Sequence, residues 1–77
     1  MKGVRYRFDQ DLFSLHMRER RTDRKMGQRM LADTIGCSSA HVSHVENGTE
    51  PSIRMFAAVC SVLKMDPSLY IKIIVIH

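Results

Sequence analysis

Apolar positions divide the middle of the chain into short helices. Leu31, Ala32 and Ile35 lie three and four residues apart, so they share one stripe of a helix expected over about residues 28–35. Gly36 follows that stripe, and glycine tolerates the left-handed conformation that commonly ends a helix. The pattern therefore predicts a helix followed by a sharp turn of about four residues.

A second helix is predicted from Ser39 to Glu46, with Ser38 or Ser39 as its N-cap. Val42 and Val45 face inward together. The opposite side carries only small or hydrogen-bonding residues in two rows at i, i+4 spacing, Ser39, Ala40, Ser43 and His44. Such a face suits the major groove of DNA, about 12 Å wide, because Ser and His bond base edges and an Ala methyl meets a thymine methyl.

Three further helices are predicted around this pair. The first is capped by Asp9, runs to about Arg21 and has an inward stripe of Leu12, Phe13, His16 and Met17. The fourth is capped by Ser52 and has the largest apolar face, Ile53, Phe56, Val59, Cys60 and Leu63. A short fifth helix starts at Asp66 and Pro67 and includes Leu69, Tyr70 and Ile73. The expected fold is an all-α, compact five-helix bundle.

The two ends of the chain are open to two interpretations. Val4, Tyr6 and Phe8 alternate with two arginines, and residues 70–76 are rich in β-branched residues. One interpretation is a frayed amino terminus and a fifth helix that ends in a disordered tail. The other is a short strand at one or both ends, paired with the other end or with a second subunit.

The central segment resembles the helix-turn-helix domain of the Cro/CI-like phage-repressor (XRE) family. The resemblance covers about residues 13–70 and rests on spaced positions: Arg21, Gln28, Leu31-Ala32, Gly36, Val42, Glu46-Asn47-Gly48 and Pro51. It implies a lambda-repressor-like DNA-binding domain. Gly27 stands where the family usually has Ser or Thr, which makes a weaker N-cap.

The resemblance also implies roles for individual residues. Gln28 and Asn47 would each bond a DNA phosphate, and Arg21 and Glu46 would form a charged pair that ties the first helix to the third. The positions that typically contact bases or adjacent backbone are Ser38, Ser39, Ala40, Ser43 and His44. These lack the Gln and Arg that make bidentate base contacts, so part of the specificity is expected to come from DNA shape.

Charge agrees with a polyanionic partner. Twelve basic and eight acidic residues give a net charge of +4, with a pI near 9.5. Six basic residues fall between Arg18 and Arg29. Such a run is either a solvated helix end and loop or a source of phosphate contacts from Arg24, Lys25 and Arg29.

Length and the apolar C-terminal end predict a single domain that dimerises. We divide the chain into an N-terminal arm (1–8), a helix-turn-helix domain (9–72) and an apolar tail (73–77) that forms a possible dimer contact. So small a chain cannot hide its C-terminal apolar residues alone, so we expect a homodimer interface at Leu69, Tyr70, Ile73, Ile74 and Ile76. A two-fold dimer would read an inverted repeat with half-sites about 34 Å apart.

Other classes of function find little support in the sequence. Two cysteines without a CxxC motif or secretory segment indicate a cytoplasmic protein, and no apolar stretch is long enough for a membrane span. His41, His44 and Cys37 lack the further ligands that a structural metal needs. No nucleophile turn or glycine-rich phosphate loop is present, so we expect no enzyme activity and no cofactor.

The sequence thus predicts a dimeric transcriptional repressor that reads double-stranded DNA at a palindromic operator. The alternative is an antitoxin-like or adaptor module that binds a protein partner through its apolar C-terminal segment.

Overall fold

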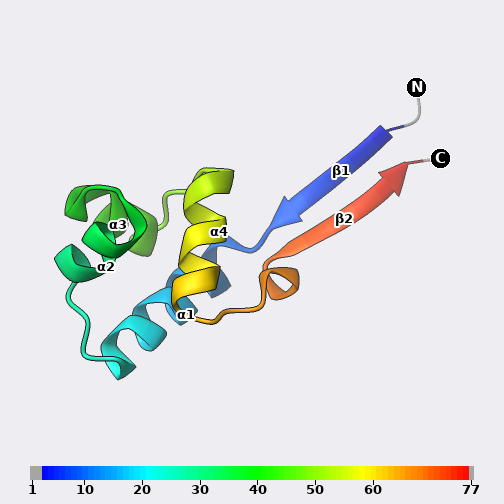
Figure 1. The fold of residues 1–77 in the computed structure, drawn as a ribbon. Helices are drawn as coiled ribbons and strands as arrows, with labels where there is room; N and C mark the ends of the chain where they lie inside the picture. The colour runs from blue at the N-terminus through cyan, green and yellow to red at the C-terminus, as the bar shows by residue number, and fades with distance from the viewer. Residues whose placement is uncertain (1–2, 77) are drawn as a thin grey trace.

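The computed structural model describes residues 3–76, and side chains within that range from 5 to 74. The helices are α1 (Gln10–Asp23), α2 (Gln28–Ile35), α3 (Ser39–Glu46) and α4 (Ile53–Val62). A single 3-10 turn, η1 (Pro67–Leu69), follows α4. Two strands, β1 (Gly3–Phe8) and β2 (Ile71–Ile76), flank this helical body in the sequence and pair with each other. The domain is therefore mostly helical, with one two-stranded sheet (Figure 1).

Local capping explains where three of the helices begin. The side chains of Asp9, Ser38 and Ser52 accept backbone N–H bonds of 3.1 Å from the third residue that follows each of them. Gly27 precedes α2 and supplies no side-chain cap. α2 therefore depends more on packing than on its own first turn.

The core joins all the helices to the base of the strands. Phe13, Phe56 and Tyr70 form an aromatic cluster with Phe8, and the Phe13 and Phe56 ring centroids are 5.2 Å apart. The Tyr70 hydroxyl is 2.7 Å from Nδ1 of His16. Tyr70, which we expected at a dimer interface, is only 2% exposed, and its ring fills the monomer's own core.

The predicted fifth helix is not confirmed. After the three residues of η1 the chain becomes the strand β2, which runs antiparallel to β1 with Phe8 opposite Ile71 and Gly3 opposite Ile76. The β-branched residues from Ile71 onward fit a strand better than a helix, and β1 offers them a partner. Both ends thus form strands that pair with each other, and β2 continues across the boundary between residues 72 and 73, where we expected the tail to begin.

The strands form a ribbon that extends from the helical body. The molecule measures 45 × 20 × 19 Å, and the ribbon leaves on the side away from α2 and α3 (Figure 1). The backbone N–H of Asp9 donates to the carbonyl of Tyr70 at 2.7 Å and closes the ribbon's base. None of the helices in residues 3–76 has the length and apolar character that a membrane span requires.

Candidate nucleic-acid interface

The turn between α2 and α3 holds the two helices in a fixed relation. Gly36 has a φ of 79°, and Cys37 donates its N–H to the carbonyl of Ala32 at 2.9 Å. Leu31 and Ala32 of α2, like the valines of α3, are buried. This packing places the remaining side of α3 at the surface.

The side of α3 that we expected to read DNA is exposed. Ser38, Ser39, Ala40 and His44 are exposed, and Ser43 is half-buried. Asn47 follows α3, is exposed, and donates from Nδ2 to the Ser43 hydroxyl at 3.3 Å. These residues therefore form one polar face, the α3 face, which the ribbon does not cover (Figure 1).

An ion pair joins the end of α3 to α1. Nε and Nη2 of Arg21 donate to the two carboxylate oxygens of Glu46 at 2.7 and 2.9 Å. The Glu46 side chain is fully buried and that of Arg21 is 12% exposed. Arg21 also donates from Nη1 to the carbonyl of Met26, at 2.8 Å. One guanidinium thus fixes α1, the connection before α2, and α3.

Electrostatics favour the charged forms of this pair. Burial alone would raise the pKa of Glu46, but hydrogen bonds from Arg21 and Gln28, with the Arg21 charge, hold it below its ordinary value. The pKa of Arg21 is raised, chiefly by its hydrogen bond to Glu46. The pair is therefore ionised at neutral pH, and it anchors the C-terminal end of α3 to α1.

Gln28 is placed partly by the same carboxylate. Its Nε2 donates to Glu46 Oε1 at 3.2 Å, and the residue is half-buried. A side-chain amide has two N–H donors, so one remains for a partner at the start of α2. The Glu46 carboxylate thereby orients Gln28, the residue that the family resemblance predicts to bond a DNA phosphate.

Sequence reasoning missed a polar row on α1 that holds the end of α3. The Gln10 amide and the Ser14 hydroxyl donate to the carbonyl of Val45, at 3.1 and 2.7 Å. Arg18 donates to the carbonyl of Glu46 at 3.3 Å. The last carbonyls of a helix lack the usual intrahelical donors; that of Val45 also accepts the backbone N–H of Gly48, at 3.2 Å. The i, i+4, i+8 spacing of the three residues was a signal that could have revealed the row.

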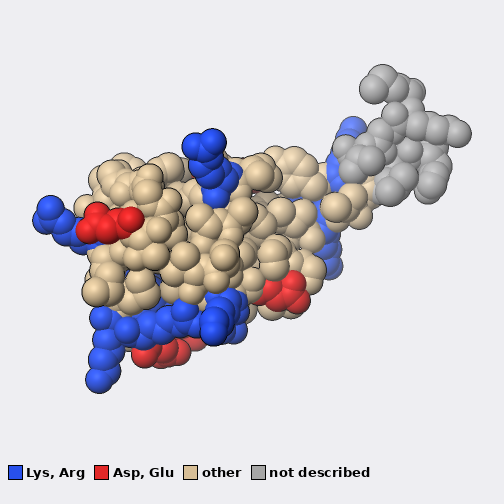
Figure 2. All heavy atoms as spheres, in the orientation of Figure 1, with Lys and Arg blue, Asp and Glu red and all other residues tan. Residues whose placement is uncertain are grey.

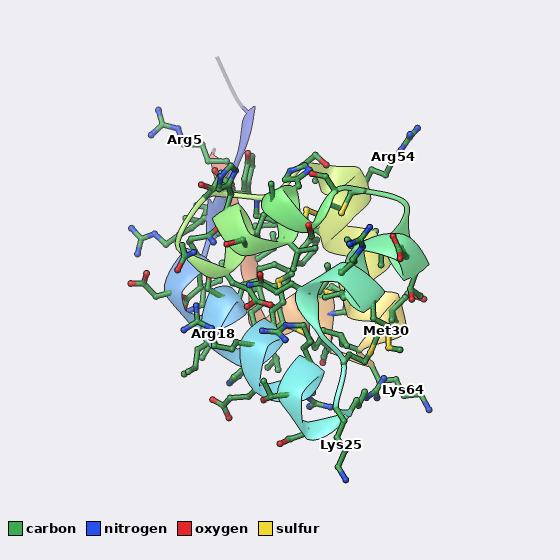
Figure 3. The ribbon with its side chains drawn as sticks, turned by 90° about the vertical axis from the view of Figure 1, so that its left-hand side faces the viewer. Arg5, Arg18, Lys25, Met30, Arg54 and Lys64 are labelled. Carbon is green, nitrogen blue, oxygen red and sulfur yellow. The ribbon has the colours of Figure 1, made fainter. Side chains whose placement is uncertain are left out.

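Arg18 also extends this row to the surface. Its Nη2 lies 3.5 Å from the side-chain oxygen of Asn47, and its Nε lies 3.5 Å from the Glu46 carboxylate. The Arg18 side chain is 52% exposed, and it projects at one edge of the helical body in Figure 3. A cationic group thus stands beside the residue expected to bond a phosphate.

The basic residues expected to reach phosphates differ in how free they are. Arg24 donates from Nη1 to the carbonyl of Val62 at 2.6 Å, which caps the end of α4. Lys25 and Arg29 are exposed. Lys25 lies at the same end of the helical body as Lys64 (Figure 3), and basic side chains gather along the lower edge in Figure 2.

The residues expected at a dimer interface do not share one surface. Leu69 is 56% exposed and lies in η1, outside the ribbon. Ile73 and Ile74 are adjacent in β2, so they point to opposite faces of the ribbon. Tyr70 is in the core. The side chain of Ile76 lies outside the described residues.

Other chemistry has little structural basis. Within the described part of the chain, no three His, Cys, Asp or Glu side chains are grouped so as to hold a metal ion. Burial raises the pKa of the Cys60 thiol to about 11, and that of Cys37 is also raised by burial. Neither thiol is therefore activated as a nucleophile.

Comparison with known proteins supports the same picture. A family model described as helix-turn-helix matches residues 17–70, which is more than half of the chain. Comparison with curated proteins gave no match, and comparison with solved structures gave none either.

Proposed function

The chain belongs to the XRE-type helix-turn-helix family of DNA-binding regulators, and on this premise we propose that it is a dimeric repressor of transcription. It occupies an operator with an inverted repeat and blocks polymerase there. The observation that carries this proposal is the α3 face, which is polar, is not covered by the ribbon, and is held at the C-terminal end of α3 by the Arg21–Glu46 pair.

In this proposal α3 lies in the major groove. Ser39, Ala40, Ser43 and His44 meet base edges, and Ser38 meets the adjacent backbone. Because these side chains are short and make no bidentate contacts, DNA shape supplies part of the discrimination.

Phosphate contacts set the register of α3 on the duplex. Gln28 at the start of α2 and Asn47 after α3 bond phosphates on the two sides of the groove. Lys25 and Arg29 add charge near α2. Arg24 contributes to the local positive potential, but its bond to the carbonyl of Val62 occupies part of its guanidinium.

A direct test selects bound sites from a random DNA pool with the purified chain at fixed salt. The expected result is one enriched motif with two-fold symmetry and half-sites about one turn of DNA, ~34 Å, apart. A Ser43→Ala/His44→Ala variant should then lose discrimination between that motif and random DNA while its melting temperature is unchanged. An unaltered specificity ratio would reject the α3 face as the reading surface.

A second candidate function rests on the exposed apolar side chains near the C-terminal end, such as Leu69 and Ile73. It is an antitoxin-like or adaptor role in which these residues hold a protein partner. The two functions are separated by whether the chain alone is dimeric and retards a palindromic fragment in a salt-dependent manner. A repressor should dimerise and retard the palindromic fragment without any protein partner.

A further inference from the structure

The ribbon has one apolar and one basic face. Residues directly opposite in an antiparallel pair share a face, so Tyr6 lies with Ile73, and Phe8 with Ile71. The other face carries three cations, Arg5, Arg7 and Lys72, together with Ile74. Phe8 and Ile71 pack against the core, but Tyr6 is 65% and Ile73 70% exposed. The apolar face thus starts in the core and continues beyond it without cover.

A cleft of about 350 Å³ lies at the base of this face, between the ribbon and the start of α4. Ile53, the first residue of α4, stands at this cleft and is 76% exposed. Most of the other residues that line it are apolar: Tyr6, Phe8, Pro51, Phe56 and Ile71. Glu50 and Ser52 add two polar side chains. Protruding apolar residues and a hollow therefore occur on the same side of the ribbon.

We propose that the apolar ribbon face and this cleft form the contact with a second copy of the chain. The two ribbons pack face to face and antiparallel about a two-fold axis, so Tyr6 and Ile73 of each copy cover the cleft of the other. This inference rests on the dimeric regulator proposed above and names the surface that makes the dimer. It replaces a C-terminal contact with one that includes the N-terminal strand and the start of α4.

Self-complementarity identifies the occupant as a second copy. A two-fold contact uses the same patch on both subunits, and this patch contains both the protrusion and the hollow that receives it. A ribbon of six residues per strand is about 20 Å long, which is enough for the outer half of one ribbon to lie over the base of the other. An isolated two-stranded ribbon is only marginally stable in water, so a covering layer also stabilises it.

Charge supports the choice of face. The opposite face would bring Arg5, Arg7 and Lys72 of both copies together, and burying like charges is costly. When the apolar faces meet, all three cations stay in water. Among the residues that the structure describes, Glu50 is the only charged one that lines the cleft, so an ionic partner would find little there to bind.

The available area fits a dimer of modest affinity. Tyr6, Ile53 and Ile73 are each at least 65% exposed, and a large side chain carries roughly 200 Å² of surface, so the three offer on the order of 400 Å² per copy. Two copies then bury on the order of 800 Å², which places this contact among the weak protein interfaces. Binding to two adjacent half-sites would reinforce such a contact.

The test measures self-association without DNA, by sedimentation equilibrium over a concentration series. Tyr6→Thr/Ile73→Thr removes the outer apolar face and leaves a β-branched residue, which favours strands, at both positions. Ile74→Thr is the matched control, because it lies next to Ile73 on the opposite face. We expect the double variant to weaken dimerisation about tenfold or more, and the control to match the wild type.

A second variant keeps the test independent of the ribbon's own stability. Ile53→Lys places a charge at the cleft from an exposed helix position, so the monomer should retain its helical circular dichroism while dimerisation weakens at least as much. The proposal is overturned if Ile74→Thr has the larger effect, if Ile53→Lys has none, or if the wild type remains monomeric throughout the series.

DNA binding distinguishes this inference from the proposed function. On a fragment with a single half-site, Ile53→Lys should bind as well as the wild type, and on the full inverted repeat it should lose cooperativity. If wild type and variant both fail to bind DNA while dimerisation responds as expected, the regulator fails and the interface stands. If both bind the full repeat with equal cooperativity, the interface fails and the regulator stands.

Discussion

Arg21 and Glu46 are 25 positions apart in the chain, yet two hydrogen bonds of 2.7 and 2.9 Å join them. The pair ties α1 to the end of α3, and the Glu46 carboxylate also accepts a bond from Gln28. One buried carboxylate therefore connects the fold of the domain to the placement of its α3 face.

Glu46→Ala should destabilise the protein strongly. The change leaves the Arg21 charge mostly buried without its partner, which typically costs about 3–5 kcal/mol. Chemical denaturation at neutral pH measures the free energy of unfolding. The matched control, Arg21→Met/Glu46→Leu, removes both charges and should be clearly more stable than the single variant. Equal stability of the two variants would contradict this account.

Acid should weaken the fold through the same carboxylate. Because the folded-state pKa of Glu46 lies below its ordinary value of 4.5, its stabilising contribution is present above that value and is lost as pH falls through the folded-state pKa. The free energy of unfolding should therefore fall as the pH is lowered below that ordinary value. Glu46→Gln should flatten this dependence more than Asp66→Asn, whose exposed carboxylate has a pKa lowered by hydrogen bonds from Ser68. Identical slopes would exclude Glu46 as the main group.

Arg18→Gln should weaken DNA binding without changing sequence preference. Arg18 stands beside Asn47 and is half exposed, so it adds a charge where a phosphate is expected. Loss of one phosphate contact lowers affinity for all sequences alike and reduces the slope of log K against log salt by about one. The control is Arg20→Gln, which lies in the same helix and contacts the carbonyl of Lys64 instead. A changed preference among operators would instead place Arg18 among the base contacts.

Lys64→Gly should stabilise the fold. Lys64 follows α4 with a φ of 55°, and Met65 donates its N–H to the carbonyl of Cys60 at 2.8 Å, so the helix ends in a Schellman motif. A left-handed conformation costs a non-glycine residue roughly 1 kcal/mol, and glycine does not have this strain. The greater conformational freedom of glycine in the unfolded chain offsets part of the gain. Thermal melting should shift upward by a few degrees, whereas Ser61→Gly within α4 should shift it downward. A lower melting temperature for Lys64→Gly would show that the lysine side chain contributes more than the strain costs.

Local patterns were sufficient for the central helices. The stripe of Leu31, Ala32 and Ile35, with Gly36 behind it, places α2 and the turn, and Ser38 starts α3. These features act within one or two helical turns, so they are visible in the sequence. The C-terminal end of α1 was less sharp, because the helix continues through residues 22 and 23, beyond Arg21, where we expected it to end. No apolar position of its stripe marks that end.

Long-range pairing explains what the sequence left open. Pro67 and the apolar residues beyond it are compatible with a helix when taken alone, and only the presence of β1 as a partner makes a strand the better state. The same limit applies at the site: Arg24 is basic and exposed, but its bond to the carbonyl of Val62 depends on how α1 packs against α4. Gln10, Ser14 and Arg18 gain their roles from the same kind of docking against α3.

The antiparallel ribbon also decides how the domain responds to force. Gly3 and Ile76 face each other at its outer end, so a pull that separates them loads one hydrogen-bonded pair at a time, in the manner of a zipper. The strands should part at low tension, and no helix carries load until the bond between Asp9 and Tyr70 breaks. Mechanical resistance then begins at the aromatic cluster, and optical-tweezer traces should record an early, gradual extension before one abrupt step.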